Sequence, residues 1–467
     1  MELEEEISEP VSPTGQYISS SVLSFYILAV LESEIPIHSL PAMSLLKDIF
    51  LPINPRFSSV MVEDKHGAKK WKPVEVKLED HIRTPIFPAG RSPEFYDEYL
   101  KDYLSKIAVD QLPQSRPLWE VHLIKYPTSD AAGSIIFKLH HALGDGFSLM
   151  GALLSCLQRA DNPSLPLTFP SRQSNNKLDH KKDNIFQRVT QTFSGFINTA
   201  LDFGWSLLKS NMIEDDLTPI RSGVDGVEFR PIAIATMTFS LDDIRQIKAN
   251  LKVTINDVIT GIIFFGIRLY MHAASNELSK NTESTAMVLL NTRSLGGYKS
   301  ISEMAKSNAE MPWGNHFAFL HVSIPNLTEV ESSNPLNFVL ETHRIIKSKR
   351  NSAAVHLTGW LLEALRKLRG PEATARYIHS TLSNSSMTIT NLIGPVERMA
   401  LANHPIAGLY FNVAGSPQSV SVTMVSYVGK LRVSVGVEKG FIDPQKFTSC
   451  IENAFEIMLK AAVQSTS

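Results

Sequence analysis

The stretch that decides the fold is SIIFKLHHALGDG, which runs from Ser134 to Gly146. Its first seven residues place Ile135, Phe137 and Leu139 on one face of an extended chain, and this alternation predicts a strand. From Ser148 to Arg159 the apolar residues recur at helical spacing instead. The sequence therefore predicts a strand, a tight loop and a helix, and the loop that leaves the strand is a common place for a functional site.

The loop begins with two adjacent histidines, His140 and His141. Because side chains alternate along a strand, the two imidazoles cannot face the same way while the strand continues. This disfavours a two-histidine metal site and predicts one imidazole in a cleft and the other in packing. An imidazole titrates near neutral pH, so it can take a proton from an alcohol that attacks an acyl group. Asp145 could serve simply as the cap of the next helix, and Gly146 could supply a positive φ.

Other kinds of acyl-transfer chemistry find no support in the sequence. There is no Gly-x-Ser-x-Gly elbow, and neither Cys156 nor Cys450 lies in a recognisable nucleophile motif. Two cysteines so far apart fit neither a disulfide framework nor a zinc site, and they suit a reducing compartment. A glycosidase-like pair of carboxylates has no local support either.

The overall composition is that of a folded protein with two domains or one large duplicated one. The 467 residues are 43% hydrophobic and 20% charged, and 45 Lys and Arg against 47 Asp and Glu give a net charge of -2. Such a balance lacks the excess of positive charge that is typical of proteins that bind nucleic acid. No apolar run approaches the roughly 18–20 residues of a spanning helix.

Composition divides the chain into four parts. Residues 1–21 form a flexible acidic tail, 22–161 the first α/β block, 162–222 a polar linker with an amphipathic helix, and 223–467 the second block. The second block is predicted to contain two helices, one from Ile255 to Ala273 capped by Thr254 and one from Val355 to Leu368 that ends at Gly370-Pro371. A hairpin of Val420–Met424 and Leu431–Val437 is predicted to follow. A last helix is predicted to begin after its cap, Asp443. Intermixed strands and helices indicate α/β layers.

The linker carries an apolar stripe on one predicted helical face. Its members are Ile185, Val189, Phe193, Phe196, Ile197, Leu201 and Leu208. Packing on a core explains such a stripe, and so does contact with a membrane surface, which the nearby Lys181, Lys182 and Arg188 favour.

The His-His-x-x-x-Asp-Gly motif at residues 140–146 resembles the signature of the wax ester synthase/diacylglycerol acyltransferase family. That family belongs with the acyl-CoA-dependent transferases of the chloramphenicol acetyltransferase and BAHD type. Further landmarks occur in the family's order, namely Pro117–Glu120, Asn256-Asp257, Asn291-Thr292-Arg293, Trp313-Gly314-Asn315 and Asn391–Pro395. The resemblance covers about Val22 to Ala462 and is closest to the plant branch. One departure is that residues 185–213, where plant members often carry a hydrophobic span, contain Arg188, Asp202 and Lys209.

The resemblance implies two chloramphenicol-acetyltransferase-like α/β subdomains with a tunnel at their interface. It further implies that a fatty acyl group passes from acyl-CoA to a long-chain alcohol, or to diacylglycerol, without a metal or redox cofactor. We expect a location at the cytosolic face of the endoplasmic reticulum membrane, or at the plasma membrane. The alternatives are another hydroxyl acceptor, such as a sterol, a terpenoid or a small alcohol, and a catalytically silent lipid-binding protein.

The resemblance also assigns the site residues. His141 is the expected general base. The residues expected to support it are His140, Asp145, Gly146 and Arg293. The candidates for lining the tunnel or binding substrate are Trp119, Asn256, Asp257, Asn391, Gly394 and Pro395. In related acyltransferases the motif's Asp pairs with an Arg from the other half, so we expect an ion pair between Asp145 and Arg293. Each tunnel candidate also has a structural alternative: a core position for Trp119, a helix first turn for Asn256-Asp257 and a strand-ending turn for Asn391–Pro395.

Overall fold

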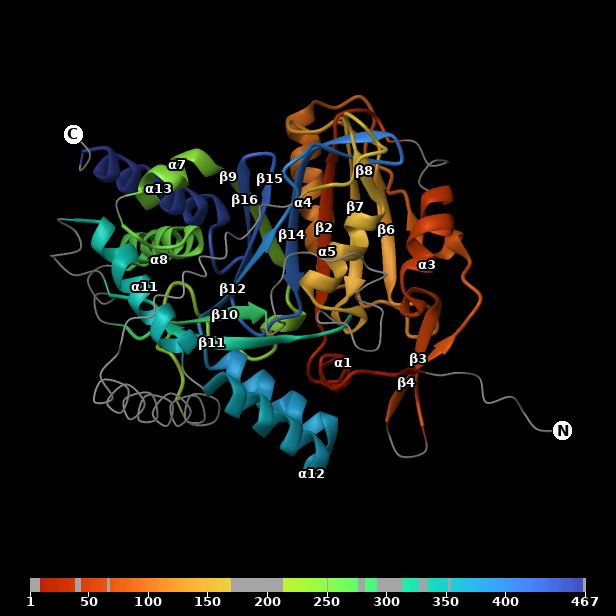
Figure 1. Cartoon of the computed structure of the whole chain (residues 1–467), viewed down its shortest axis with the longest axis horizontal. Coiled ribbons are helices and arrows are strands. Elements are labelled where there is room, and N and C mark those ends of the chain that lie inside the picture. The colour runs from red at the N-terminus through yellow and green to blue at the C-terminus, as the bar shows by residue number, and fades with distance from the viewer. Residues whose placement is uncertain are drawn as a thin grey trace, which may run out of the picture.

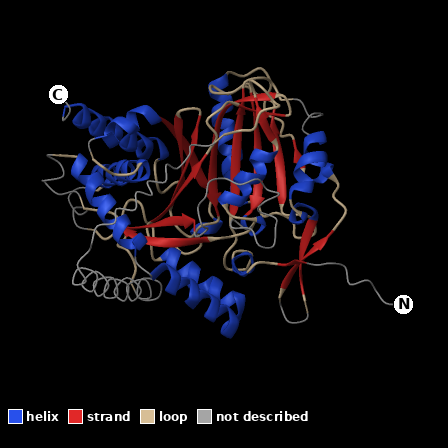
Figure 2. Ribbon diagram, in the orientation of Figure 1, coloured by secondary structure: helices blue, strands red, loops and turns tan. Residues whose placement is uncertain are grey.

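The structure is a computed structural model that describes residues 9–37, 43–64, 68–168, 213–249, 251–275, 282–291, 313–326, 334–351 and 354–464. Of the three β-sheets in the described residues, the two larger lie side by side, each with its own helices (Figures 1 and 2). The third is small and has the strand order β1 (Glu9–Pro10), β4 (Lys69–Pro73) and β3 (Ser59–Glu63). The N-terminal part of the chain builds most of one lobe and the C-terminal part builds the other. The predicted helix at residues 185–208, its basic neighbours and Arg293 lie outside the described residues.

The sheet of the first lobe has seven strands. In spatial order they are β5 (Ile82–Arg83), β6 (Trp119–Ile124), β7 (Gly133–His140), β2 (Tyr26–Ser33), β14 (His404–Ala414), β13 (Met399–Leu401) and β8 (Leu157–Arg159). The strand predicted at Ser134–His140 is confirmed as β7. Strands β13 and β14 come from the far end of the chain, so the C-terminal half completes the sheet of the N-terminal half. The division into blocks 22–161 and 223–467 stays a prediction. The flexible tail predicted at residues 1–21 is wrong for residues 9–21, because β1 pairs with β4, α1 (Pro13–Tyr17) follows, and Val11 and Ile18 are buried.

Strand β7 is buried on both faces because a helix covers each side. Ile27, Phe137 and Leu139 share a core with α5 (Gly146–Ser155), whereas Leu28 and Ile136 share a core with α4 (Pro93–Val109). The helix predicted to reach Arg159 is too long: α5 ends at Ser155, and Leu157 lies in β8, where pairing with β13 replaces helical hydrogen bonds. Pairing across the lobe explains why local spacing misled the prediction.

The sheet of the second lobe has six strands. In spatial order they are β11 (Phe317–Ser323), β10 (Thr285–Asn291), β12 (Met387–Ile393), β15 (Val420–Tyr427), β16 (Lys430–Glu438) and β9 (Ile232–Ser240). The predicted hairpin is confirmed as β15 and β16, and Gly429 takes a φ of 72° in its turn. Strands β10, β12 and β15 run parallel to one another.

The helices of the second lobe are α7 (Leu241–Ala249), α8 (Ile255–Ala274), α11 (Leu336–Asn351), α12 (Ala354–Ser383) and α13 (Pro444–Gln464). The predicted start of α8 is confirmed, because Thr254 and Asp257 form a reciprocal capping box. The predicted cap of α13 is also confirmed, since the Asp443 carboxylate accepts from the amides of Gln445 and Lys446.

Helix α8 is the one described helix that is long and apolar enough to span a membrane, but 78% of the apolar window is buried inside the protein. It packs against α7, α11 and α13. A side chain at Gly266 would place its Cβ 2.6 Å from the Cα of Ile451 in α13, so glycine permits this close approach. Helix α8 is therefore a core helix.

Helix α12 consists of two segments, and the predicted helix end at Gly370-Pro371 is confirmed as the break between them. Gly370 adopts a non-helical conformation with a φ of 85°, and a second helical segment begins at Pro371 and continues to Ser383. Proline is well suited to the first turn of the new segment, where its missing N–H costs nothing. The pair therefore ends the first segment and begins the second.

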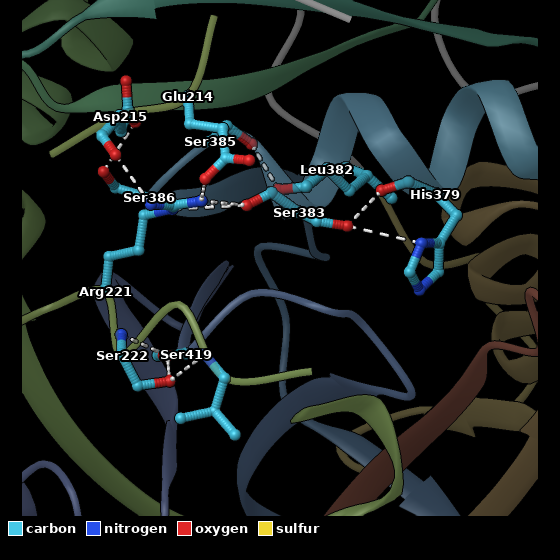
Figure 3. Close-up of polar contacts among 11 residues, drawn as sticks. Glu214, Asp215, Arg221, Ser222, His379, Leu382, Ser383, Ser385, Ser386 and Ser419 are labelled. Atoms are coloured by element: carbon cyan, nitrogen blue, oxygen red, sulfur yellow. Dashed lines mark hydrogen bonds and ion pairs between the residues drawn. The ribbon is translucent and has the colours of Figure 1, made fainter. Parts of the chain in front are cut away.

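The chain that leads into the second lobe is tied down by a cluster of polar contacts (Figure 3). Arg221 donates to the carbonyl oxygens of Ser383 and Asp215, and the carboxylate of Asp215 accepts from Ser386 and Thr285. These contacts give buried charged groups the partners that they need. They fix the chain where β10, β12 and α12 meet, and their role is structural.

Candidate active site

His141 lies at the point where the two lobes meet. It follows β7, begins a short 3-10 turn (His141–Leu143), and its amide donates to the carbonyl of Phe25 over 2.9 Å. Only 6% of the residue is exposed. The rings of Phe25 and of Phe317 from the second lobe pack at its edges, with centroid distances of 6.3 Å and 5.5 Å. The imidazole is therefore enclosed by apolar groups from both lobes.

Asn315 from the second lobe holds His141 by two hydrogen bonds. The Asn315 Nδ2 donates to the His141 carbonyl oxygen over 3.0 Å, and Asn315 Oδ1 lies 3.0 Å from Nδ1 of the imidazole. Because a carbonyl oxygen can only accept, the first bond fixes which amide atom faces which group. Oδ1 then requires a proton on Nδ1, so Nε2 keeps its lone pair. This is the tautomer that a base acting through Nε2 needs.

Burial lowers the pKa of His141 below its usual value, and desolvation is the largest cause. The negative charge of Asp145 and the hydrogen bond with Asn315 oppose the shift. The imidazole is consequently neutral at physiological pH and able to accept a proton.

His140 is held in the opposite way on the other side of the strand. Its Nδ1 accepts from the Ala142 amide over 3.0 Å, so the proton is on Nε2, which lies 3.1 Å from Ser24 Oγ. The ring also packs edge-on against Tyr26 at 5.1 Å. Burial lowers the pKa of His140 to about 3. Both of its nitrogens are engaged, so this histidine supports the loop.

Asp145 links the loop to the other lobe through backbone groups. Its carboxylate accepts from the Ser148 amide over 3.0 Å, which caps α5, and from the His316 amide over 2.9 Å. The expected ion pair with Arg293 stays a prediction, because Arg293 lies outside the described residues. Ser148 in turn exchanges hydrogen bonds with both backbone groups of Gly314, at 3.0 Å and 3.2 Å.

Two further side chains donate hydrogen bonds to the carbonyl oxygen of Leu143. Trp313 donates its indole N–H over 2.9 Å, and Arg56 approaches at 3.4 Å. Together with Gly314, Asn315 and His316, Trp313 forms a clamp of consecutive residues (313–316) that holds the histidine loop. Sequence reasoning noted Trp313-Gly314-Asn315 as a landmark but gave it no chemical role.

The alternative role for Gly146, to supply a positive φ, is not found. Gly146 begins α5 and is not among the glycines with positive φ; instead, a Cβ there would lie 3.3 Å from Leu392 of β12 in the second lobe. Glycine at this position permits close contact between the lobes.

The tunnel candidates lie in three places. Trp119 is fully buried and donates to the Phe57 carbonyl, so it is a core residue. Asn256 meets Asn391 through a 3.2 Å hydrogen bond, and Asp257 accepts from Thr254 and lies 2.8 Å from His343 Nδ1.

The strand-ending turn predicted at Asn391 begins later, because pairing with β15 keeps the chain extended through Ile393. Gly394 and Pro395 follow the strand and are buried. A Cβ at Gly394 would lie 2.1 Å from the Ser426 carbonyl oxygen, which leaves no room for a side chain.

Two cavities lie near the histidine loop, and His141 is in the lining of neither. A polar cavity of about 440 Å³ is lined in part by His140, Ser24 and Lys69. A much smaller apolar cavity of about 30 Å³ lies behind α5, where Leu139, Gly146 and Leu392 contribute to the lining. Among the described residues, no group of three or more His, Cys, Asp or Glu side chains is arranged to hold a metal ion.

A thiol nucleophile is not available near the site. Burial raises the pKa of Cys156 to about 12 and also raises that of Cys450, so both remain protonated. The arrangement offers a neutral, oriented base in a dry setting.

Comparison with solved structures defines the class of fold. The chain matches the wax ester synthase/diacylglycerol acyltransferase from Marinobacter aquaeolei VT8 with a TM-score of 0.61 and 15% identity, over 97% of this chain and 99% of that one. It also matches the first condensation domain of the CDA synthetase with a TM-score of 0.54 and 11% identity, over 94% and 90%. The predicted fold class, two α/β subdomains of the chloramphenicol acetyltransferase type, is confirmed.

Comparison with protein families then names the family. Residues 49–259 match the wax ester synthase/diacylglycerol acyltransferase catalytic domain, and residues 313–459 match the WS/DGAT C-terminal domain. Two relatives from Arabidopsis thaliana are wax ester synthase/diacylglycerol acyltransferase 4 (28% identity, 98% of this chain and 91% of the relative) and 6 (29%, 99% and 95%). The chain belongs to the wax ester synthase/diacylglycerol acyltransferase family.

The burial of His140 predicts a pH dependence of stability. Its pKa is about 3 in the folded chain and near 6.5 when unfolded, so between these values the unfolded chain binds a proton that the folded chain excludes. The free energy of unfolding therefore falls as the pH drops through this window. His140→Asn keeps an acceptor for the Ala142 amide but cannot titrate. Urea titrations at about pH 7.5 and 5.5 should show a loss of stability in the wild type that exceeds the variant's loss by about 1 kcal/mol. Equal losses would mean that His140 is not buried in its neutral form.

Proposed function

We propose that this chain is an acyl-CoA-dependent O-acyltransferase that esterifies a long-chain alcohol, and diacylglycerol, with His141 as the general base. Membership of the wax ester synthase/diacylglycerol acyltransferase family supports the reaction class. The observation that carries the assignment of the base is the hydrogen bond of Asn315 to Nδ1, which leaves Nε2 free. Together they favour direct transfer without a covalent acyl-enzyme.

In the proposed reaction the acceptor hydroxyl donates its hydrogen bond to Nε2 of His141. As the oxygen attacks the thioester carbonyl carbon, its proton moves to Nε2, and the imidazolium that forms keeps its Nδ1–H on Asn315. Asp145 favours the positive charge electrostatically. The carbon–sulfur bond then breaks, and the departing thiolate of coenzyme A takes the proton from Nε2. The products are an ester and free coenzyme A, and the base is restored.

The choice of lipid substrates rests on apolar surroundings. The aromatic rings of Phe25 and Phe317 flank the imidazole. Burial of a hydrocarbon chain is favourable by roughly 0.8 kcal/mol per CH₂, so such a site selects long chains strongly. The competing proposals are another acceptor, such as a sterol or small alcohol, and a silent lipid-binding role. Coenzyme A release with hexadecanol, with diacylglycerol and without acceptor distinguishes all three.

Loss of the base should remove most of the activity. His141→Ala should lower turnover by about 10²–10⁴, the usual contribution of a positioned acid–base group, while the protein stays folded. Coenzyme A release by the purified variant measures this, and circular dichroism checks the fold. The control is His272→Ala, an exposed histidine in the last turn of α8. Near-wild-type turnover of His141→Ala would contradict the mechanism.

We further propose that the protein attaches to the cytosolic face of the endoplasmic reticulum membrane through residues 185–208. The support is the apolar stripe that includes Phe193, Phe196 and Leu201, which follows Lys181 and Lys182 in the sequence. These residues lie outside the described part of the chain.

This attachment predicts that Phe196→Glu with Leu201→Glu shifts the protein toward the soluble fraction of expressing cells, because two charges on the apolar face oppose insertion. Fractionation followed by immunoblotting measures the shift. An unchanged distribution would count against attachment through this stretch.

A further inference from the structure

The first segment of α12, before the kink at Gly370, leaves large apolar side chains in solvent. Trp360 is 72% exposed, Leu368 84% and Leu357 38%. At 100° per residue these three side chains share one face with Leu361 and Leu365. We call these five residues the α12 face. Leu362 points elsewhere and packs against the buried cluster formed with Ile378 and Leu382. The first segment of α12 is therefore apolar on two sides: the side of Leu362 packs against the protein, and the α12 face is exposed to solvent.

An exposed apolar face of this kind indicates a surface that binds a partner. Single exposed hydrophobic residues are ordinary, but a stripe over three turns of one helix is not. Tryptophan is enriched where an apolar phase meets water, because its ring is apolar and its N–H stays near polar groups. In Figure 1 α12 lies at the outer edge of the molecule, below both sheets.

The charges around the α12 face favour an anionic surface. From Glu341 to Glu372 the sequence holds seven Lys or Arg residues and three acidic residues, although the whole chain has a net charge of -2. Arg344 pairs with Glu341, and Arg366 and Lys367 pair with Glu363, so a local excess of positive charge remains. Lys367 and Arg369 are exposed on α12, and Lys347 and Arg350 are exposed at the end of α11. Basic residues beside an apolar helical face are attracted to anionic lipid headgroups.

The second segment of α12 connects this face with the active site. Ile378 and Leu382 share a buried cluster with Phe25, and Phe319 packs against the same cluster. The ring of Phe25 lies 6.3 Å from that of His141, and Phe317 lies 5.5 Å from both His141 and Phe319. Apolar side chains thus lead continuously from α12 to the imidazole.

We propose that the α12 face docks on the surface of a bilayer that contains anionic lipids, and that the lipid acceptor approaches His141 from this side. The second part rests on the proposed acyltransferase function, whereas the docking does not. The occupant is a lipid surface because the face combines exposed Trp and Leu side chains with a local excess of positive charge.

Vesicle binding by the full-length protein tests the docking. Phosphatidylcholine vesicles with and without phosphatidylserine are sedimented with the wild type, with Trp360→Glu/Leu368→Glu, and with Ile86→Glu. Ile86 is 91% exposed and lies in the first lobe after β5, which makes it a matched control. We expect the double variant to bind the phosphatidylserine vesicles about tenfold less tightly or worse, because burial of a single leucine side chain is worth at least that factor. Ile86→Glu should bind as the wild type does.

Quenching by brominated lipids is an independent measurement. Tryptophan fluorescence should be quenched in the wild type, and the quenching should fall in Trp360→Phe, which keeps an apolar side chain. Vesicle binding by the double variant equal to that of the wild type would overturn the docking proposal. So would a loss of self-association, measured by ultracentrifugation, without a loss of vesicle binding, because the face would then bind a second copy of the chain.

Activity assays separate this proposal from the proposed function. With a short-chain acyl-CoA and a water-soluble alcohol, the double variant should turn over as the wild type does; with hexadecanol embedded in vesicles, its rate should fall in parallel with binding. A wild type that releases no coenzyme A with any acceptor defeats the proposed function, while the vesicle measurements still decide the docking. A double variant that loses binding but keeps full activity on embedded hexadecanol overturns the proposed route of the acceptor.

Discussion

The clamp formed by residues 313–316 on the histidine loop is the constraint on which the site depends. A catalytic imidazole at the end of a strand has no fixed orientation by itself, because the strand's hydrogen bonds end with it. Here the second lobe supplies hydrogen-bond partners to the carbonyl of His141, to the backbone amide and the carboxylate of Asp145, and to the imidazole itself. Strands β13 and β14 add to the same effect, since they tie the C-terminal half of the chain into the first sheet. The lobes cannot separate without releasing His141.

Burial gives the two adjacent histidines opposite roles. Desolvation lowers the pKa of both, so both are neutral, and the hydrogen-bond partner of Nδ1 then decides what each can do. An amide N–H faces Nδ1 of His140 and an amide oxygen faces Nδ1 of His141. Both ring nitrogens of His140 are consequently engaged in hydrogen bonds that support the loop, whereas Nε2 of His141 keeps its lone pair of electrons. One motif therefore provides a support and the proposed base from the same residue type.

Local features of the fold could be predicted from the sequence. The alternation of β7, the capping box of α8 and the Asp443 cap of α13 depend on residues close together in the chain. The family's landmarks gave the two-lobed architecture and the place of His141. Features that join distant segments were missed, because spacing within a window carries no information about them: β13 and β14 in the first sheet, β8 after α5, and Asn315 as the partner of His141. At Gly370-Pro371 the local rule predicted the break correctly, but not the second helical segment, whose Ile378 and Leu382 are buried in a cluster with Phe25.

The central claim is that Asn315 holds His141 as the Nδ1–H tautomer with a free Nε2. The most direct measurement is a long-range ¹H–¹⁵N correlation spectrum of protein labelled at its histidine side chains, with the His141 signals assigned by comparison with His141→Gln. The account predicts at neutral pH a protonated, pyrrole-like Nδ1 and an unprotonated, pyridine-like Nε2 for His141, and a loss of this pattern in Asn315→Ala. A proton on Nε2 with a bare Nδ1, or an imidazolium at neutral pH, would contradict the account.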